Sequence, residues 1–225
     1  MKKFISAFTL AEVLITLGII GVVASMTIPS LMQKYRKQET TARLKKFYST
    51  MSQAIMHAEA DLGMKAYEWD SVTQASNNPG QSYNETYAYY NKYLAPYIKT
   101  LKVEKGVYDT QNNINSKTKV YFPDSSTMEI NSGYCVSLYY DVNGDKKPNE
   151  LGRDIFLFFI ATSFIHQFEG REQELYENRS FDAVYLPLYN TKAKALDACK
   201  RDAKYCSSYL MYNNFEIPDD YPYKI

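Results

Sequence analysis

The pattern of hydrophobic and polar positions divides the chain into one long apolar run and a polar, tyrosine-rich remainder. Residues 8–28 (FTLAEVLITLGIIGVVASMTI) are apolar, small or hydroxylic, except for one charge at Glu12. An α-helix rises 1.5 Å per residue, so these 21 residues would extend about 30 Å, the thickness of the hydrocarbon core of a bilayer. The run therefore predicts a membrane-spanning helix over residues 8–29.

The helical pattern continues beyond Pro29, where we expect a kink rather than an end. Apolar residues recur at spacings of three and four, which predicts one buried stripe on an amphipathic helix over residues 30–62. The stripe comprises Leu44, Phe47, Met51, Ile55, Ala58 and Leu62. Gly63 then supplies a C-terminal cap. We expect a single helix from Phe8 to about Leu62 whose second half packs against a sheet.

The remaining residues, 63–225, are predicted to form one globular head. Segment 111–119 is polar and predicts a turn-rich connection, whereas alternating or continuous apolar runs further on predict strands. The predicted strands cover residues 134–141, 155–162 and 183–188, and a short helix is expected over 191–203. The fold class is therefore α+β, with a long N-terminal helix packed on a C-terminal antiparallel sheet.

The residues before the apolar run form a short basic leader. Residues 1–7, MKKFISA, contain two lysines and end in a small residue. A secretory signal has a shorter apolar region with a small-residue cleavage site on its far side. Here the far side reads SMTIP, a poor version of that site, so we expect cleavage between Ala7 and Phe8.

Glu12 lies four residues into the predicted membrane helix, where an unpaired carboxylate is energetically unfavourable and needs a partner. Cleavage before Phe8 would create an α-amine at the same depth in a neighbouring chain, and Glu12 would pair with it. The alternative is that the side chain of Glu12 extends to the membrane surface from one turn inside the helix.

These features together resemble the N-terminus of type IV pilins and of the pseudopilins of type II secretion. The shared motif is a basic leader, a small residue, then Phe8, Thr9, Leu10 and Glu12 followed by a continuous apolar helix. The resemblance implies a prepilin peptidase that cuts after Ala7 and methylates the amine of Phe8, and a role for Glu12 in filament assembly. Ala7 departs from the family pattern, which nearly always has glycine there.

The resemblance also implies a pilin-like head and a non-enzymatic, structural function. The leading expectation is a pseudopilin-like component of a type II secretion system, and the alternative is a type IV pilus pilin in adhesion, motility or DNA uptake. The expected partners are the prepilin peptidase, other pilin or pseudopilin subunits and the inner-membrane assembly platform. The protein would span the inner membrane once, with its head outside the cytoplasm, before it joins an extracytoplasmic filament.

The cysteines bear on the compartment of the head. Cys199 and Cys206 are seven residues apart, which in an unbroken helix is about 10 Å along the axis, too far for a disulfide. A turn between them would bring them within reach, and export past the membrane favours a bridge over two free thiols. Cys135 is interpreted as a free thiol in the strand over residues 134–141.

A polar loop over residues 141–154 (DVNGDKKPNELGRD) joins two predicted strands. Its oxygen-bearing side chains alternate as ligands do in calcium loops, although the loop is not an EF-hand, since Lys146 and Gly152 stand at the positions of the required glycine and glutamate. The candidate ligands are Asp141, Asn143, Asp145 and Asp154.

The position of this loop resembles the calcium loop of major pseudopilins, and calcium is the only cofactor that the sequence suggests. The other interpretation is a hydrogen-bonded turn at Asn143 and Gly144, stabilised by Asx bonds, with Arg153 in a surface ion pair. The residues alone leave both interpretations open.

Composition adds few constraints on function. The formal net charge is +1, so no global field favours nucleic acid as a partner. A basic stretch after the apolar run is interpreted as a solvated helix face; it comprises Lys34, Arg36, Lys37, Arg43, Lys45 and Lys46. We find no sequence pattern of a catalytic site, which agrees with a non-enzymatic subunit.

Overall fold

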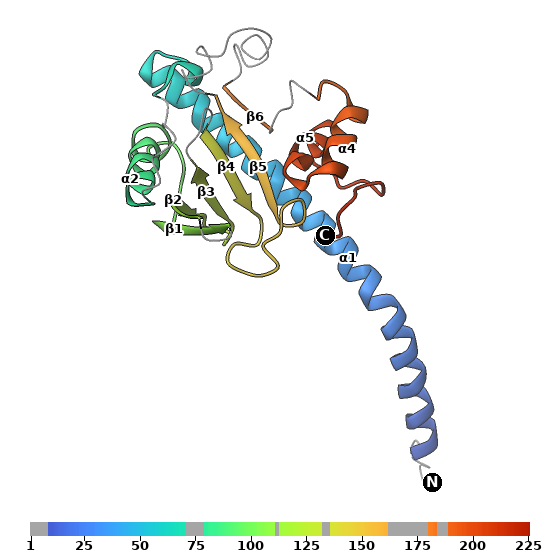
Figure 1. Cartoon of the computed structure of the whole chain (residues 1–225). Helices are drawn as coiled ribbons and strands as arrows, with labels where there is room; N and C mark the ends of the chain where they lie inside the picture. Colours follow the sequence, from blue (N-terminus) through green and yellow to red (C-terminus); the bar gives the residue numbers. More distant parts are fainter. Residues whose placement is uncertain (1–8, 71–78, 111–112, 132–135, 162–179, 184–188) are drawn as a thin grey trace, which may run out of the picture.

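A computed structural model describes residues 9–70, 79–110, 113–131, 136–161, 180–183 and 189–225. One long helix, α1 (Leu10–Leu62), projects from an α+β head (Figure 1). The helix continues through Pro29 and ends at Gly63, whose φ of 67° is the left-handed conformation that glycine adopts without a steric cost. The predicted single helix is thus confirmed from Leu10 onward.

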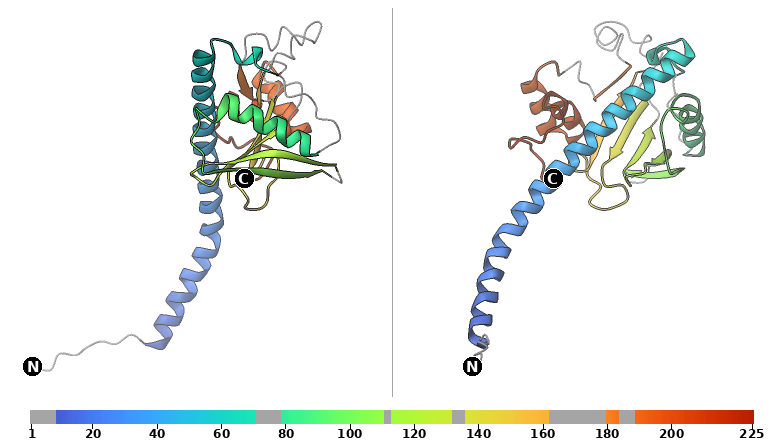
Figure 2. Two further views of the ribbon diagram at one scale, coloured as in Figure 1. Left: turned by 90° about the vertical axis from the view of Figure 1, so that its left-hand side faces the viewer. Right: turned by 180° about the vertical axis from the view of Figure 1, so that it is seen from behind.

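The head contains one antiparallel sheet whose six described strands follow one another in chain order. In the centre of the sheet, Tyr140 lies opposite Met128 on one side and opposite Phe156 on the other. The views in Figure 2 show α1 crossing one face of this sheet. The strands are β1 (Lys102–Thr110), β2 (Asn113–Tyr121), β3 (Thr127–Asn131), β4 (Val136–Asp141), β5 (Ile155–Ile160) and β6 (Phe181–Ala183).

The core lies between α1 and the sheet, as the apolar stripe predicts. Every member of the stripe from Leu44 to Ala58 is at most 4% exposed. The ring of Phe47 stacks on Tyr140 with 3.9 Å between centroids, and it lies 5.2 Å from Phe158. Leu62, the last predicted member, is 40% exposed at the end of the helix. The α+β fold with a helix packed on an antiparallel sheet is therefore confirmed.

A second layer covers the β1–β2 end of the sheet. It consists of α2 (Pro79–Tyr89), which continues into a π-helical turn, η2 (Tyr90–Leu94). Between α1 and α2 the chain forms the short helix η1 (Ala66–Glu68). Trp69 is fully buried here and stacks on Tyr93 with 4.5 Å between ring centroids. A buried hydrogen bond of 2.9 Å joins the hydroxyls of Thr86 in α2 and Thr118 in β2.

The predicted turn-rich connection over residues 111–119 is wrong, because most of that segment lies in β2. The strand escaped prediction because polar residues occupy its buried positions. Lys117 is only 2% exposed, and its ammonium lies 4.9 Å from the centroid of the Tyr139 ring. Burial lowers the pKa of Lys117 to about 8, since desolvation penalises the charged form.

The C-terminal segment packs beside β5 and β6 (Figure 1). It contains α4 (Lys192–Arg201), a 3₁₀ turn η4 (Ala203–Tyr205) and α5 (Cys206–Tyr212). The turn separates Cys199 from Cys206 and brings their Cα atoms to 4.4 Å, and the two residues form a disulfide. The predicted pairing is thus present, whereas Cys135 lies outside the described residues.

Replacing both Cys199 and Cys206 with Ser should lower the free energy of unfolding of the head by about 2.5 kcal/mol, the chain-entropy cost of freeing an eight-residue loop. For a domain of this size the loss corresponds to a fall in melting temperature of roughly 5–10 °C. Calorimetry of the double variant measures it. Reductant should lower the melting temperature of the wild type and leave the variant unchanged; an equal effect of reductant on both would contradict the assignment.

Candidate functional site

The first functional candidate is the N-terminal end of α1. Thr9 caps the helix, and the carboxylate of Glu12 accepts hydrogen bonds of 2.8 Å from both the backbone N–H and the hydroxyl of Thr9. The backbone N–H of Glu12 donates to the Thr9 hydroxyl at 3.3 Å, which completes a reciprocal capping box. Ala7 and Phe8, the predicted cleavage residues, lie outside the described residues.

The capping box gives Glu12 a partner within its own chain. No salt bridge to Glu12 is present among the described residues. Its carboxylate stabilises the helix start through hydrogen bonds and through its position at the positive end of the helix dipole. Pairing of Glu12 with the amine of a neighbouring chain therefore stays a prediction.

The lower half of α1 presents bare apolar surface. Among the described helices, α1 alone is long and apolar enough to cross a membrane. None of its most apolar stretch of 18 residues is buried. Side chains such as Leu14, Ile20 and Val22 are more than half exposed. Isolated apolar side chains are common on protein surfaces, but a continuous exposed run of this length requires an apolar environment or a partner.

The second candidate is the loop between β4 and β5. The carboxylate of Asp141 accepts hydrogen bonds of 3.0 Å from the backbone N–H groups of Asn143 and Gly144, which forms an Asx turn. Gly144 has a φ of +70°, and a Cβ there would come within 2.2 Å of the backbone oxygen of Ser125. The loop is therefore packed tightly on the β2–β3 turn.

Asp154 holds the other end of this loop. It is 3% exposed and accepts hydrogen bonds from the side-chain amide of Asn143 at 2.9 Å and from the backbone N–H of Asn149 at 2.8 Å. Its second oxygen accepts from the backbone N–H of Glu150 at 2.5 Å. The carboxylate thus orders the loop through N–H donors, and no ion pair with a basic side chain is present among the described residues.

Asp145, the fourth predicted ligand, lies apart from the other three. Its carboxylate forms an ion pair of 2.8 Å with Lys119 of β2 and lies 3.5 Å from the hydroxyl of Tyr121. The hydrogen bond from Lys119 lowers the pKa of Asp145. The structure therefore brings together Asp141, Asn143 and Asp154 but not Asp145.

Three carboxylate oxygens that a calcium ion could use, Oδ1 of Asp141 and both oxygens of Asp154, already accept N–H donors in this loop. The described residues contain no group of three or more His, Cys, Asp or Glu arranged to hold a metal ion. The predicted Asx turn is observed, as is an ion pair of 3.1 Å between Arg153 and Glu150. One observation favours a ligand: Oδ1 of Asn143 is buried without a hydrogen-bond partner among the described residues. The calcium assignment stays a prediction.

Burial of Asp141 is electrostatically unfavourable at neutral pH. Desolvation raises the pKa of its carboxyl from 3.8 to about 7; the nearby charge of Asp154 also raises it, while the Asx-turn hydrogen bonds oppose the shift. The loop therefore contains a group that titrates near neutrality, unlike a solvated aspartate.

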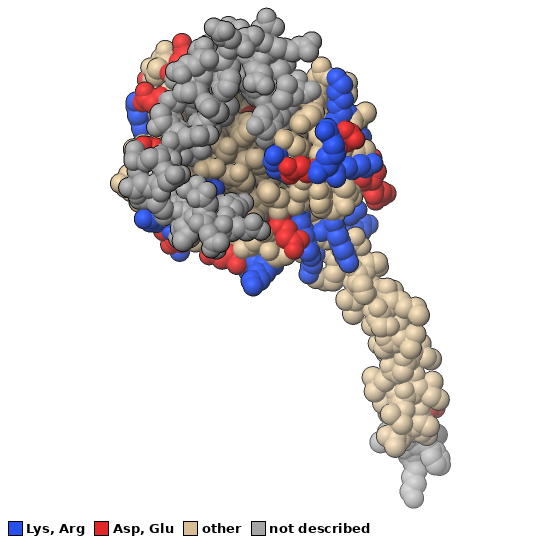
Figure 3. Space-filling model, in the orientation of Figure 1, with Lys and Arg blue, Asp and Glu red and all other residues tan. Residues whose placement is uncertain are grey.

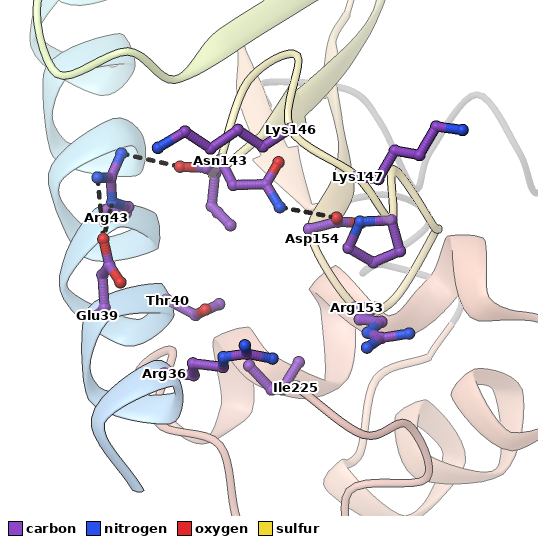
Figure 4. Close-up of a pocket in the computed structure, with 12 residues that line it drawn as sticks. Arg36, Glu39, Thr40, Arg43, Asn143, Lys146, Lys147, Arg153, Asp154 and Ile225 are labelled. Carbon is purple, nitrogen blue, oxygen red and sulfur yellow. Dashed lines mark hydrogen bonds and ion pairs between the residues drawn. The ribbon is translucent and has the colours of Figure 1, made fainter. Parts of the chain in front are cut away.

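Beside this loop lies a cavity of about 220 Å³ between α1 and the β4–β5 connection (Figure 4). Five cationic side chains line it, against the carboxylates of Glu39 and Asp154. The cations are Arg36, Arg43, Lys146, Lys147 and Arg153. Figure 3 shows Lys and Arg side chains gathered at the end of the head where α1 emerges. We call this cavity the basic pocket.

Arg43 builds one wall of the basic pocket. Its guanidinium pairs with Glu39 at 3.0 Å and donates to the backbone oxygens of Asp124 at 3.0 Å and Val142 at 2.8 Å. Such charge-assisted bonds are short and directional, so Arg43 fixes the distance between the helix and two loops of the head.

This pocket is not predicted from the sequence, where the basic stretch after the membrane run is interpreted as a solvated helix face and Lys146 as a departure from the EF-hand pattern. A usable signal was present, because Arg36, Thr40 and Arg43 have the spacing of one helical face. The spacing does not show that the β4–β5 loop lies against that face of the helix, because this contact joins residues far apart in the sequence.

The chain belongs to a family of unknown function, DUF6613, because the family model matches residues 30–225, most of its length. The match begins just after the apolar run and covers the whole head. No curated protein and no solved structure matches the chain.

The raised pKa of Asp141 predicts an unusual pH dependence for the fragment 30–225. The unfolded chain releases this proton near pH 4 and the folded protein near pH 7, so the contribution of Asp141 to stability falls as the pH rises through that window. Asp141→Asn keeps an oxygen for the Asx turn and removes the charge. We expect it to raise the free energy of unfolding relative to wild type at pH 8, on the order of a few kcal/mol, and to have little effect at pH 4.

Asp145→Asn is the matched control, because it removes the same charge from the same loop. The ion pair with Lys119 lowers the pKa of Asp145, so this variant should be no more stable than wild type from pH 5 to pH 8. A gain in stability in both variants would mean that general charge repulsion, not burial of Asp141, causes the effect.

The calcium assignment is tested by repeating the thermal unfolding with millimolar calcium and with chelator. It requires that calcium raise the melting temperature of the wild type and that Asp141→Asn abolish this rise.

Proposed function

We propose that this member of DUF6613 is a structural subunit of a type IV pilin-like filament, most closely a pseudopilin-like component of a type II secretion system. The observation that carries the proposal is the single helix of 53 residues, whose first half exposes a membrane-length apolar surface and whose second half is built into the head. The basic leader and the motif from Phe8 to Glu12 precede and begin this helix.

Such a helix suits a subunit that is stored in a membrane and later extracted. While the subunit is stored, lipid covers the exposed apolar surface; in a filament, the same surface of neighbouring subunits would replace lipid. Because the upper half of α1 packs on the sheet through Phe47 and its neighbours, the head would move with the helix as one body. The role requires no catalytic step and no cofactor, although calcium would be compatible with it.

The proposed location is the inner membrane, spanned once, with the head outside the cytoplasm. The disulfide between Cys199 and Cys206 supports an exported head, since such bonds persist in oxidising compartments. The proposed partners are a prepilin peptidase, an inner-membrane assembly platform and further pilin or pseudopilin subunits.

A type IV pilus pilin is the second candidate. The disulfide near the C-terminus favours it, because a covalently closed loop there would stabilise a head exposed at a fibre surface. The β4–β5 loop favours the secretion assignment through its resemblance to the calcium loop of pseudopilins. Loss of secretion, as opposed to loss of surface fibres, in a deletion strain separates the two.

The proposal predicts processing between Ala7 and Phe8. Intact-mass measurement of the mature protein from its native host should show the loss of residues 1–7 and the addition of one methyl group. Ala7→Glu places a charged side chain at the cleavage position and should leave the leader attached. A mature wild-type chain that begins at Met1 or beyond Ile28 would contradict the assignment.

The capping box allows the charge of Glu12 to be tested separately from its hydrogen bonds. Glu12→Gln keeps the capping geometry, because glutamine serves in the same box, but removes the negative charge. Glu12→Ala removes both. If Glu12 pairs with the amine of a neighbouring Phe8, both variants should insert into the membrane yet fail to enter filaments, as measured by shear fractionation.

Thr9→Ala serves as the control, since it removes the cap at a cost of about 1 kcal/mol and leaves the charge in place. It should still assemble. Normal assembly of Glu12→Gln together with failure of Thr9→Ala would show that the helix cap matters rather than the charge, and the pairing account would be wrong.

A further inference from the structure

We propose that the basic pocket binds the phosphate of an anionic phospholipid in the membrane leaflet next to the head. This inference rests on α1 spanning a membrane and does not depend on filament assembly. The pocket combines an excess of positive charge, a volume suited to a small polar group and a position at the membrane end of the head.

The charge of the pocket is only partly compensated within the protein. Arg43 and Arg153 have carboxylate partners in Glu39 and Glu150. In the part of the chain that the structure describes, Arg36 and Lys146 have no ion pair. Figure 4 shows Arg36 extending from α1 toward the cavity and Lys146 extending from the loop toward α1. Two cations from different elements thus line one cavity without an ion pair among the described residues, so the cavity favours an anion.

The depth of the pocket matches that of lipid headgroups. Exposed apolar side chains continue along α1 to Leu31, Met32 and Tyr35, and Arg36 follows directly. Arg36 is seven residues beyond Pro29, the end of the predicted membrane-spanning segment, or about 10 Å along the helix axis, and an arginine side chain can reach back toward the membrane surface. The polar headgroup region extends roughly 5–8 Å beyond the hydrocarbon core on each side of a bilayer. Tyr35 is itself a residue type enriched at this interface.

The chemistry of the walls favours a phosphate. A guanidinium presents a planar fork of N–H donors that matches phosphate oxygens, and an ammonium binds phosphate as a point charge. The cavity of about 220 Å³ is smaller than typical pockets for organic ligands, about 300–1,000 Å³, so it would take a headgroup rather than acyl chains. The acyl chains would lie along the exposed apolar side of α1 below it.

The test measures the melting temperature of the full-length chain in a neutral detergent during titration with short-chain lipids. Dioctanoyl phosphatidylglycerol should raise the melting temperature in a saturable way. Dioctanoyl phosphatidylcholine, which carries a compensating cation, should raise it less, and inorganic phosphate at the same concentration should have little effect. Arg36→Gln and Lys146→Gln should each weaken the apparent affinity for phosphatidylglycerol about tenfold.

Lys34→Gln is the matched control, because it removes the same charge from the same helix two residues from Arg36 but does not line the pocket. It should keep the wild-type affinity. Equal weakening by Lys34→Gln and Arg36→Gln would mean non-specific attraction to the basic stretch and would overturn the proposal. So would an equal response to inorganic phosphate, which would indicate a site for free anions, or the absence of any response to phosphatidylglycerol.

A further outcome concerns a protein partner. If Arg36→Gln and Lys146→Gln leave the lipid response intact but abolish crosslinking between subunits, the pocket receives an acidic side chain of a neighbouring chain and the lipid proposal is wrong. Because membrane insertion and processing at Ala7 are measured separately, failure of the lipid test leaves the proposed filament function untouched.

Discussion

Phe47 lies between α1 and the sheet, with its ring 3.9 Å from that of Tyr140 and 5.2 Å from that of Phe158. Full burial of one such side chain contributes about 1.5–3 kcal/mol, and truncating it to alanine typically costs about 3–5 kcal/mol. The remaining apolar members of the stripe, from Leu44 to Ala58, pack on the same face. This contact decides the architecture, because the sheet has no other long helix against which to bury that face among the described residues.

The same contact explains why the two halves of α1 differ in their surroundings although the helix backbone is continuous. Above residue 40 the head supplies apolar neighbours, whereas the apolar side chains of α1 below Tyr35 are exposed in the described structure. Since the backbone hydrogen bonds of a helix are satisfied internally, α1 can pass from lipid to protein without a break. Pro29 lies within the continuous helix, and the N-terminal end is closed by the capping box of Thr9 and Glu12. The motif that suggests a role in assembly thus also caps the N-terminus of the helix.

Periodicity predicted α1 well because both of its signals, the apolar run and the stripe beyond it, are local. The β4–β5 loop was ambiguous because calcium ligands and Asx turns use the same residues at the same spacing. The place of Asp145 depends on Lys119 of a distant strand, with which it forms an ion pair. Strand β2 was missed because Lys117 and Thr118 are buried there, and their burial depends on Tyr139 and on Thr86 of α2. Such non-local partners cannot be deduced from spacing.

The basic pocket also depends on a non-local contact, because it forms where the β4–β5 loop lies against α1. Arg43 holds this arrangement through bonds to Glu39 and to the backbone oxygens of Asp124 and Val142. Because these acceptors belong to α1 and to two separate turns, the walls of the pocket are fixed before any ligand arrives. Glu39 and Glu150 pair with Arg43 and Arg153, whereas Arg36 and Lys146 have no ion pair among the described residues, so an anion bound there would stabilise the folded state. The end of the head nearest the membrane is therefore the place where lipid composition and protein stability would be coupled.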